Sequence, residues 1–276
     1  MEITNCGLLK PFKRTVRQLS DGSYSNSGNS MYLLNKEYAL DPQHYIRAFL
    51  LIQEDVFELF KFVEPCDENK DTISLRIQEL LIRICVEIEA NFTAILNENI
   101  YSNRDKRSID KDYCLLEFSH KLSSYSVKFP TWKGLKNIRT PFINWSTYPN
   151  QNWHVLEWYK SYNKSKHDRH NYFVKANFDT LMDALSGLVI ILSAQFQNEN
   201  YSLQPKGRAL SGGYSYDYDE NYDSAIGGYF CVQYPKNWSN DEMYCFTWSQ
   251  IKNNENPIDK IDFDKIKEEK LPKSKK

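Results

Sequence analysis

The chain has 276 residues, of which 41% are hydrophobic and 26% are charged, and its formal net charge is −1. A globular, soluble protein with a sizeable core is expected from this length and composition. The near-zero net charge excludes a global electrostatic attraction to nucleic acid or to membranes, so any anion-binding site must be a local basic patch.

The six cysteines are spread along the chain, and no two lie within four residues of each other. This spacing excludes a CxxC metal knuckle or redox pair. The first ten residues contain Glu2 and no apolar run, so no signal peptide is expected. The longest apolar run, 184–196, is too short to span a bilayer. The sequence therefore predicts a cytoplasmic protein with reduced thiols and no membrane association.

In chain order, residues 1–41 are expected to be a loop-rich extension, because Ser, Gly and Asn are concentrated in 20–30. A helical apolar period over 42–63 predicts the first helix, which begins with a proline suited to the first helical turn. The second predicted helix starts near Asp71 or Thr72 as its capping residue and runs to about Asn97. It has the densest apolar period of the chain.

Residues 100–150 are predicted to be an insertion between the second and third helices. Within it, 112–122 fits either a strand or a short helix, and 123–150 holds three prolines and is expected to be an irregular connection. Two helices follow, over 152–170 and over 173–197; the last is strongly apolar.

The predicted architecture is therefore a bundle of about four helices over 42–200. A C-terminal extension, 201–276, follows it and ends in a charged tail. In this extension the strand-like runs 229–234 and 243–248 are joined by turn residues, which predicts a β-hairpin. The expected fold class is mainly α, a helical bundle with a C-terminal β-hairpin extension.

The most informative segment is Tyr-Asn-Lys-Ser-Lys-His-Asp-Arg-His at 162–170. If the helix is continuous, one face carries several polar side chains within an arc of roughly 100°: Tyr159, Asn163, Lys166, His167 and His170. An amide, a cation and two imidazoles suit a phosphate-binding surface, and an imidazole, with an unperturbed pKa of about 6.5, can exchange protons. The same residues also fit a basic helix end favoured by the helix dipole, so this alternative stays open.

Apart from Asp168, which points elsewhere on the helix, the two histidines lack a carboxylate or cysteine at matching spacing, so neither a metal site nor a cofactor is predicted. A second polar stripe lies on the second helix, where four residues fall within roughly 80°: Arg76, Glu79, Arg83 and Glu87. Most of that helix is apolar, so the stripe either faces solvent, with its charges paired along the helix, or faces the His167 helix. In the second case its arginines would bind phosphate, supported by its two glutamates.

Residues 162–167 resemble the motif of the HEPN superfamily, whose members are small helical bundles. Many members carry an arginine, a polar residue that is often asparagine, three variable residues and a histidine. Asn163 and His167 match the polar and histidine positions at the right spacing, whereas Tyr162 stands at the arginine position. The resemblance covers about Tyr45 to Gln197.

The resemblance implies metal-independent RNA cleavage in a site built across a homodimer. His167 would be the general acid and base for attack by the ribose 2′-hydroxyl, and Asn163 would orient the phosphate. Further candidates for contacting the phosphate, some of which would replace the missing arginine, are Arg169, Lys166, His170, Tyr162, Arg76 and Arg83. Bacterial and phage proteins of this kind often act in antiviral defence or toxin–antitoxin systems.

With Tyr162 at the arginine position, three interpretations stay open. Another cation supplies the charge and the protein is an endoribonuclease; or the altered site binds RNA without cleaving it; or the motif is structural. In the last case the protein is a non-catalytic interaction protein that dimerises through its helical bundle and binds a protein partner through the C-terminal hairpin.

Overall fold

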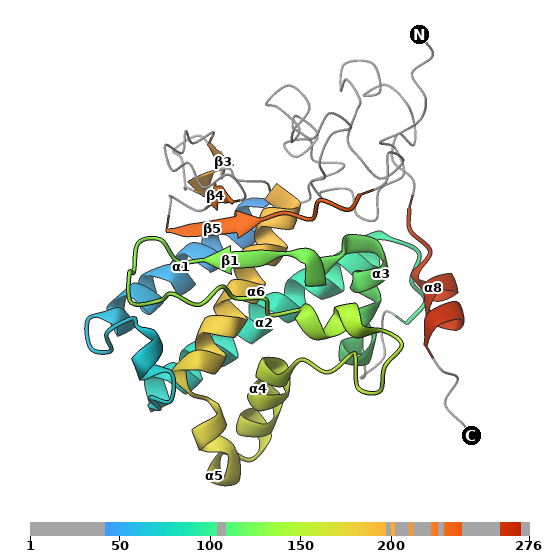
Figure 1. Ribbon diagram of the computed structural model, residues 1–276. Coiled ribbons are helices and arrows are strands. Elements are labelled where there is room, and N and C mark those ends of the chain that lie inside the picture. The colour runs from blue at the N-terminus through green and yellow to red at the C-terminus, as the bar shows by residue number, and fades with distance from the viewer. Residues whose placement is uncertain are drawn as a thin grey trace. The chain divides into compact units, whose positions relative to one another are not determined.

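The computed structural model describes residues 42–103, 109–196, 200–201, 210–211, 222–225, 229–238 and 260–271 (Figure 1). The chain forms two compact units, each made of segments far apart in sequence. Unit 1 comprises 1–40, 89–121 and 235–276, and unit 2 comprises 41–88 and 122–234. The described residues are mainly helical, as expected.

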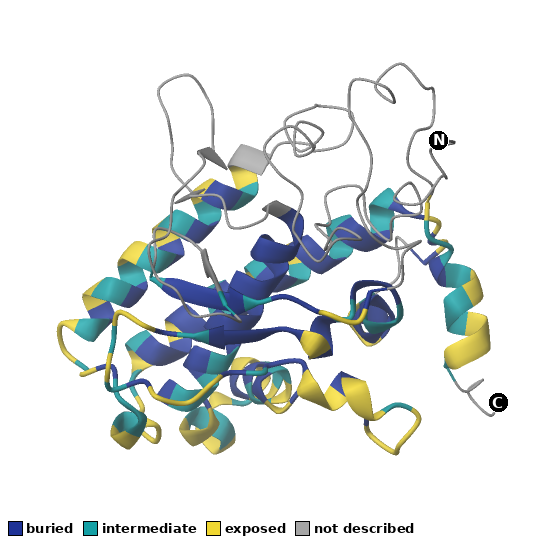
Figure 2. Ribbon diagram, turned by 45° about the horizontal axis from the view of Figure 1, so that its top comes forward, coloured by how far each residue is buried: buried dark blue, intermediate teal, exposed yellow. Residues whose placement is uncertain are grey.

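Four long helices correspond to the four that the sequence predicts. They are α1 (Pro42–Phe60), α2 (Leu75–Glu98), α4 (Glu157–His167) and α6 (Phe178–Phe196). The apolar period of α1 buries one face, with these five side chains at most 4% exposed: Ile46, Phe49, Ile52, Val56 and Leu59. The inward faces of the helices are buried and their outer faces exposed (Figure 2), as amphipathic sequences require.

Apart from Asp179 and Asp183 near its start, helix α6 is largely apolar and is buried in unit 2. Its window Phe178–Gln195 is long and apolar enough to cross a membrane by composition, but 83% of that window is buried within the protein. A helix that is apolar over most of its surface is expected in the interior of a core. The burial of α6 is therefore accounted for by the packing of unit 2.

The start of α2 differs from the prediction that Asp71 or Thr72 caps it. The helix begins at Leu75, and the hydroxyl of Ser74 accepts a hydrogen bond from the amide of Ile77 at 3.1 Å. Just before Ser74, Ile73 forms an antiparallel bridge with Asn177, so the backbone there is extended and the helix begins only after it. The carbonyl of Thr72 accepts from the amide of Phe178 at 2.9 Å, at the start of α6.

The prediction of one helix over 152–170 was wrong at both ends. Residues 151–154 form turns in which Asn152 has a positive φ of 62°, and α4 starts at Glu157. At the other end Asp168 has φ −140° and ψ 71°, which breaks the helix, and its side chain caps the short helix α5 (Arg169–Tyr172). Aspartate often competes with helical backbone bonding in this way. A 3₁₀ turn, Phe173–Lys175, leads on to α6.

The insertion contributes helices and a strand. Residues Ile109–Leu116 form a 3₁₀ helix and Glu117–His120 form α3, so the helical alternative for 112–122 is confirmed. Strand β1 (Ser126–Lys128) follows. A second 3₁₀ helix, Ile143–Thr147, precedes α4.

A three-stranded antiparallel sheet in unit 2 has the order β1-β5-β4, with β4 at Asp223–Ala225 and β5 at Phe230–Gln233. The first strand-like run of the predicted hairpin is thus confirmed as β5. Its partners are β1, with Val127 opposite Val232, and β4. The predicted second run, 243–248, lies outside the described residues. Short strands β2 (Asn200–Tyr201) and β3 (Leu210–Ser211) also pair.

Part of the charged C-terminal tail is ordered in unit 1 as helix α8 (Phe263–Lys270). The backbone of Ile100 donates to the carbonyl of Ile261 and accepts from Phe263, both at 2.9 Å. The buried carboxylate of Asp112 accepts from the ammonium of Lys267 at 2.5 Å. These contacts explain why a charged sequence forms a helix here instead of a frayed end.

Replacing Gly134 with alanine is expected to lower the free energy of unfolding by roughly 1–3 kcal/mol. A Cβ at this position would lie 2.6 Å from the Cβ of Cys66 and 2.8 Å from the carbonyl oxygen of Pro65, so backbone must shift. Gly187→Ala in α6 is the matched control, because its nearest contact would be 3.3 Å, to the ring of Phe142. Its gain in helix preference, about 1 kcal/mol, offsets that contact. Urea denaturation of both variants measures the difference; equal stabilities would contradict it.

Candidate nucleic-acid interface

The segment 160–175, here called the basic segment, covers most of α4, all of α5 and the following 3₁₀ turn. It carries five exposed cations: Lys160, Lys164, Lys166, Arg169 and Lys175. Within the segment the one carboxylate is Asp168, so its net charge is five minus one, or +4, in a chain of net charge −1; Glu157, at the start of α4, pairs with Lys160 at 3.2 Å. His167 and His170 are exposed as well. In Figure 1, α4 and α5 lie away from strands β1 and β5 of the same unit.

Three polar residues of the predicted face remain together. Asn163, Lys166 and His167 all belong to α4, so they stay within an arc of about 100°. Asn163 is half-buried, whereas Lys166 and His167 are exposed. Within the part of the chain that the structure describes, the side chains of Asn163 and His167 form no hydrogen bond or ion pair.

The break at Asp168 separates Arg169 and His170 from that face. Both are exposed and belong to α5, so the angular arithmetic that places His170 beside His167 does not apply across the break. The prediction of a continuous face through His170 was therefore wrong. Arg169 and His170 still belong to the basic segment, on the short helix α5 that follows α4.

Helix α4 is held in place by contacts on its opposite face. The indole of Trp158 donates to the carbonyl of Pro141 at 2.8 Å. The buried amide of Gln78, on α2, donates to the carbonyl of Ser165 at 3.1 Å. Trp158, Tyr162 and Ser165 are the buried residues of α4. The basic face is thus presented to solvent from a helix whose other face is part of the core.

Tyr162, at the arginine position of the resembled motif, is 0% exposed. Its hydroxyl accepts a hydrogen bond from the ammonium of Lys166 at 2.9 Å, and that ammonium lies 4.7 Å from the centre of its ring. The ring also contacts Tyr159, with 5.5 Å between the centroids. Tyr162 therefore does not contact solvent itself but orients the cation one turn later.

The charged stripe on α2 does not face the His167 helix; it is partly exposed, and its arginines pair with α1 as well as along the helix. Both Arg76 and Arg83 form ion pairs with Asp55 on α1, and Arg76 also binds Glu79 at 3.0 Å. Hydrogen bonding from Arg83, and then from Arg76, lowers the pKa of the Asp55 carboxyl against the effect of its partial burial. Because Asp55 belongs to α1, these ion pairs join α1 to α2.

The stripe is also directed away from α4. Gln78, the residue of α2 that contacts α4, lies about 200° around the helix from Arg76. Glu87, at the far end of the stripe, is half-buried, and burial raises its pKa despite the nearby positive charges of His44 and Arg83. The structure therefore brings Arg76, Glu79 and Arg83 together with Asp55 and does not bring them to His167.

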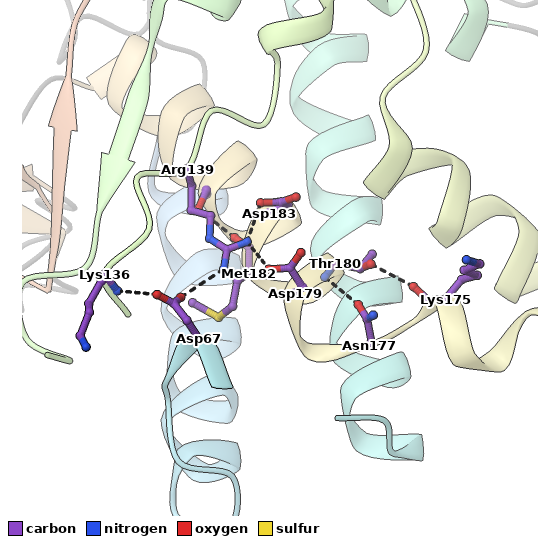
Figure 3. A network of polar contacts seen from close by, with 10 residues as sticks. Asp67, Lys136, Arg139, Lys175, Asn177, Asp179, Thr180, Met182 and Asp183 are labelled. Carbon is purple, nitrogen blue, oxygen red and sulfur yellow. Dashed lines mark hydrogen bonds and ion pairs between the residues drawn. The ribbon is translucent and has the colours of Figure 1, made fainter. Parts of the chain in front are cut away.

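A second polar cluster in unit 2 was not predicted from the sequence (Figure 3). The side chain of Arg139, 8% exposed, binds Asp179 at 2.5 Å and Asp183 at 3.0 Å, both on α6. Its other terminal nitrogen lies 3.8 Å from Asp67, whose carboxylate also accepts from the amide of Lys136 at 3.0 Å. One guanidinium thus faces three carboxylates that come from two other segments.

The local sequence carries little signal for this cluster, apart from Asp179 and Asp183 being four residues apart on one helix face. Burial raises the pKa of Asp183, and the charge of Arg139 opposes this. Among the described residues, no group of three His, Cys, Asp or Glu side chains is placed to hold a metal ion. We interpret the Arg139 cluster as a structural ion-pair network that joins α6 to two loops.

Comparisons of the chain with protein-family models, with curated proteins and with solved structures give no match. The interpretation of the basic segment therefore depends on its own geometry and charge.

Proposed function

We propose that the protein binds RNA through the basic segment and that His167 acts as the proton-transfer residue of a metal-independent RNA cleavage. The observation that carries the proposal is the concentration of five exposed cations on 160–175 in a chain of net charge −1. Lysine and arginine side chains bind nucleic acids by neutralising phosphates and releasing their counterions. A local excess of this size on a nearly neutral chain supports a local polyanion site.

The residues beside His167 support the chemical part of the proposal. Cleavage requires a base that removes the proton of the ribose 2′-hydroxyl as its oxygen attacks phosphorus, and an acid that protonates the departing 5′-oxygen. The exposed His167 can take one of these roles. Asn163, four residues earlier on the same face, can donate to a phosphate oxygen. A homodimer would provide a second His167 for the other role.

The setting of such an activity is also a proposal. The resemblance of 162–167 to the HEPN motif supports a cytoplasmic effector of antiviral defence or of a toxin-type system. No cofactor is required by the proposed reaction, since proton transfer and charge neutralisation come from side chains of the chain itself.

A second candidate function is supported by a different observation. Tyr162 is buried and both arginines of the stripe are bound to Asp55, so the motif lacks an arginine directed at a phosphate. This favours a non-catalytic protein that dimerises through its helices and binds a protein partner through its C-terminal region. Such a protein would bind RNA only weakly, because its net charge of −1 does not attract a polyanion.

The test is the salt dependence of RNA binding by the full-length protein, measured by fluorescence anisotropy with a labelled single-stranded RNA in EDTA. If all five cations contact phosphates, the slope of log K against log salt is expected to be roughly −3.5, about −0.7 for each phosphate. Reversal of Lys164, Lys166 and Arg169 to glutamate is expected to weaken binding by at least about tenfold.

The matched control reverses three exposed cations elsewhere on unit 2, Arg47, Lys133 and Lys136, and so changes the net charge equally. This control should bind RNA within about threefold of the wild type, because exposed charges further than a Debye length are screened. Equal losses for the two triple variants would show that binding is non-local and would contradict the proposed interface.

A further inference from the structure

We propose that Tyr162 is a positioning residue: it holds the ammonium of Lys166 at the phosphate-binding position, so that a Tyr–Lys pair replaces the arginine of the resembled motif. This inference rests on the proposed RNA-binding function and names the cation that contacts the phosphate nearest His167.

The contacts of Lys166 carry the argument. Its ammonium donates to the hydroxyl of Tyr162 at 2.9 Å and lies over the same ring. Tyr162 is 0% exposed, so the core fixes its position. A lysine side chain normally loses considerable rotamer freedom when it binds a ligand. Here that freedom is already restricted in the free protein, which favours binding at this position.

The ammonium also keeps the capacity to bind. It has three N–H donors, of which Tyr162 uses one, and Lys166 is exposed to solvent. On α4 it lies about 60° from Asn163, with His167 on the other side of that amide. A phosphate resting on Asn163 would therefore have an oriented cation on one side and an imidazole on the other.

The remaining cations are placed less favourably. Arg76 and Arg83 bind Asp55. Arg169 follows the helix break at Asp168. Lys164 lies over the ring of Tyr172, 4.7 Å from its centre. Among the described candidates for the missing charge, Lys166 shares an unbroken helix with His167 and is oriented by a buried partner.

A double-mutant cycle tests the proposal, with Tyr162→Phe, Lys166→Met and the double variant, each as the full-length protein. The probe is a labelled single-stranded RNA oligonucleotide in EDTA. Lys166→Met should weaken binding and make the salt slope less negative by about 0.7, the value for one phosphate. Tyr162→Phe keeps the ring and the lysine charge, and should weaken binding by roughly two- to tenfold, the effect of freeing one long side chain.

The decisive comparison is between the effect of Tyr162→Phe on RNA binding in the wild type and its effect in the Lys166→Met variant. In the Lys166→Met background, Tyr162→Phe is expected to have no further effect on RNA binding, because its role is exerted through the lysine. Tyr234→Phe is the control: this buried tyrosine donates to the carbonyl of Ser193 at 3.3 Å, so its loss tests the removal of a buried hydroxyl outside the basic segment. Thermal unfolding of all variants separates loss of folding from loss of binding.

Two results would overturn the proposal. If the wild type binds RNA but the effects of the two substitutions are additive, or Tyr162→Phe binds like the wild type, the positioning role is wrong while the proposed function stands. If the wild type shows no salt-dependent RNA binding, the proposed function itself fails, and this inference fails with it.

Discussion

Replacing Arg139 with methionine is expected to lower the free energy of unfolding by about 3 kcal/mol, the lower end of the usual effect of removing one partner of a buried ion pair, because the carboxylates are partly exposed. The side chain of Arg139 is 8% exposed and lies between Asp179, Asp183 and Asp67. Without the guanidinium, Asp179 and Asp183 repel each other one helical turn apart, and Asp183 loses the charge that offsets its burial.

The loss should depend on pH in a defined direction. Burial raises the pKa of Asp183 above its ordinary value of 3.8, so the folded state binds this proton more tightly than the unfolded state. The contribution of Asp183 to stability is therefore fully present below the unfolded pKa and is lost as the pH rises through the folded pKa. Removing Arg139 should raise the folded pKa further, so the deficit of the variant is largest at neutral pH and shrinks on acidification.

Urea denaturation followed by circular dichroism, at neutral pH and at mildly acid pH, measures both effects. Arg169→Met is the matched control, because Arg169 is exposed and a surface substitution should change stability by no more than about 0.5 kcal/mol. A loss at Arg139 as small as that of the control would contradict the interpretation of the cluster. So would a deficit that grows as the pH falls.

Substitution of His167 by alanine is expected to reduce RNA cleavage by roughly 10²- to 10⁴-fold, the range that a general acid or base contributes. RNA binding should change little, because the five cations of the basic segment remain. The reaction is measured in EDTA as the disappearance of a labelled single-stranded RNA and the appearance of products ending in a 2′,3′-cyclic phosphate.

The control for this prediction is His154→Ala. His154 is also exposed, and it precedes α4 in the turns before Glu157, outside the basic segment. The His154→Ala variant should cleave RNA at the wild-type rate. Indistinguishable RNA profiles for wild type and His167→Ala would remove the catalytic role and leave RNA binding alone. Intact function in His167→Ala together with its loss after deletion of 205–276 would favour the interaction protein instead.

The local sequence predicts the helices well because helix formation depends on a period of a few residues. The apolar spacing of α1 and α6 lies within each helix, and the start of α1 at Pro42 is confirmed. The same holds for β5, whose apolar run marks it as a strand. The grouping of Asn163, Lys166 and His167 on one face also follows from helix geometry alone.

The ends of the helices were less predictable, since several residues compete to bond the same terminal amides. Asp71, Thr72 and Ser74 are all suitable capping residues by type, and the bridge between Ile73 and Asn177, at the start of α6, places the helix start after Ser74. In the same way Asp168 is compatible with a continuing helix, yet it caps a new one.

By itself, then, the sequence determined the mainly helical class, the approximate positions of the four long helices and the polar face on α4. Tertiary structure alone decided which charges meet. Asp55 reaches Arg76 and Arg83 across 21 and 28 residues, and Arg139 reaches Asp179 and Asp183 across 40 and 44. The reason is physical: periodicity shows which face of a helix is buried, but the partner of that face depends on how separate elements pack. Whether a cation near His167 is available for phosphate was therefore decided by the packing of Tyr162 and Asp55.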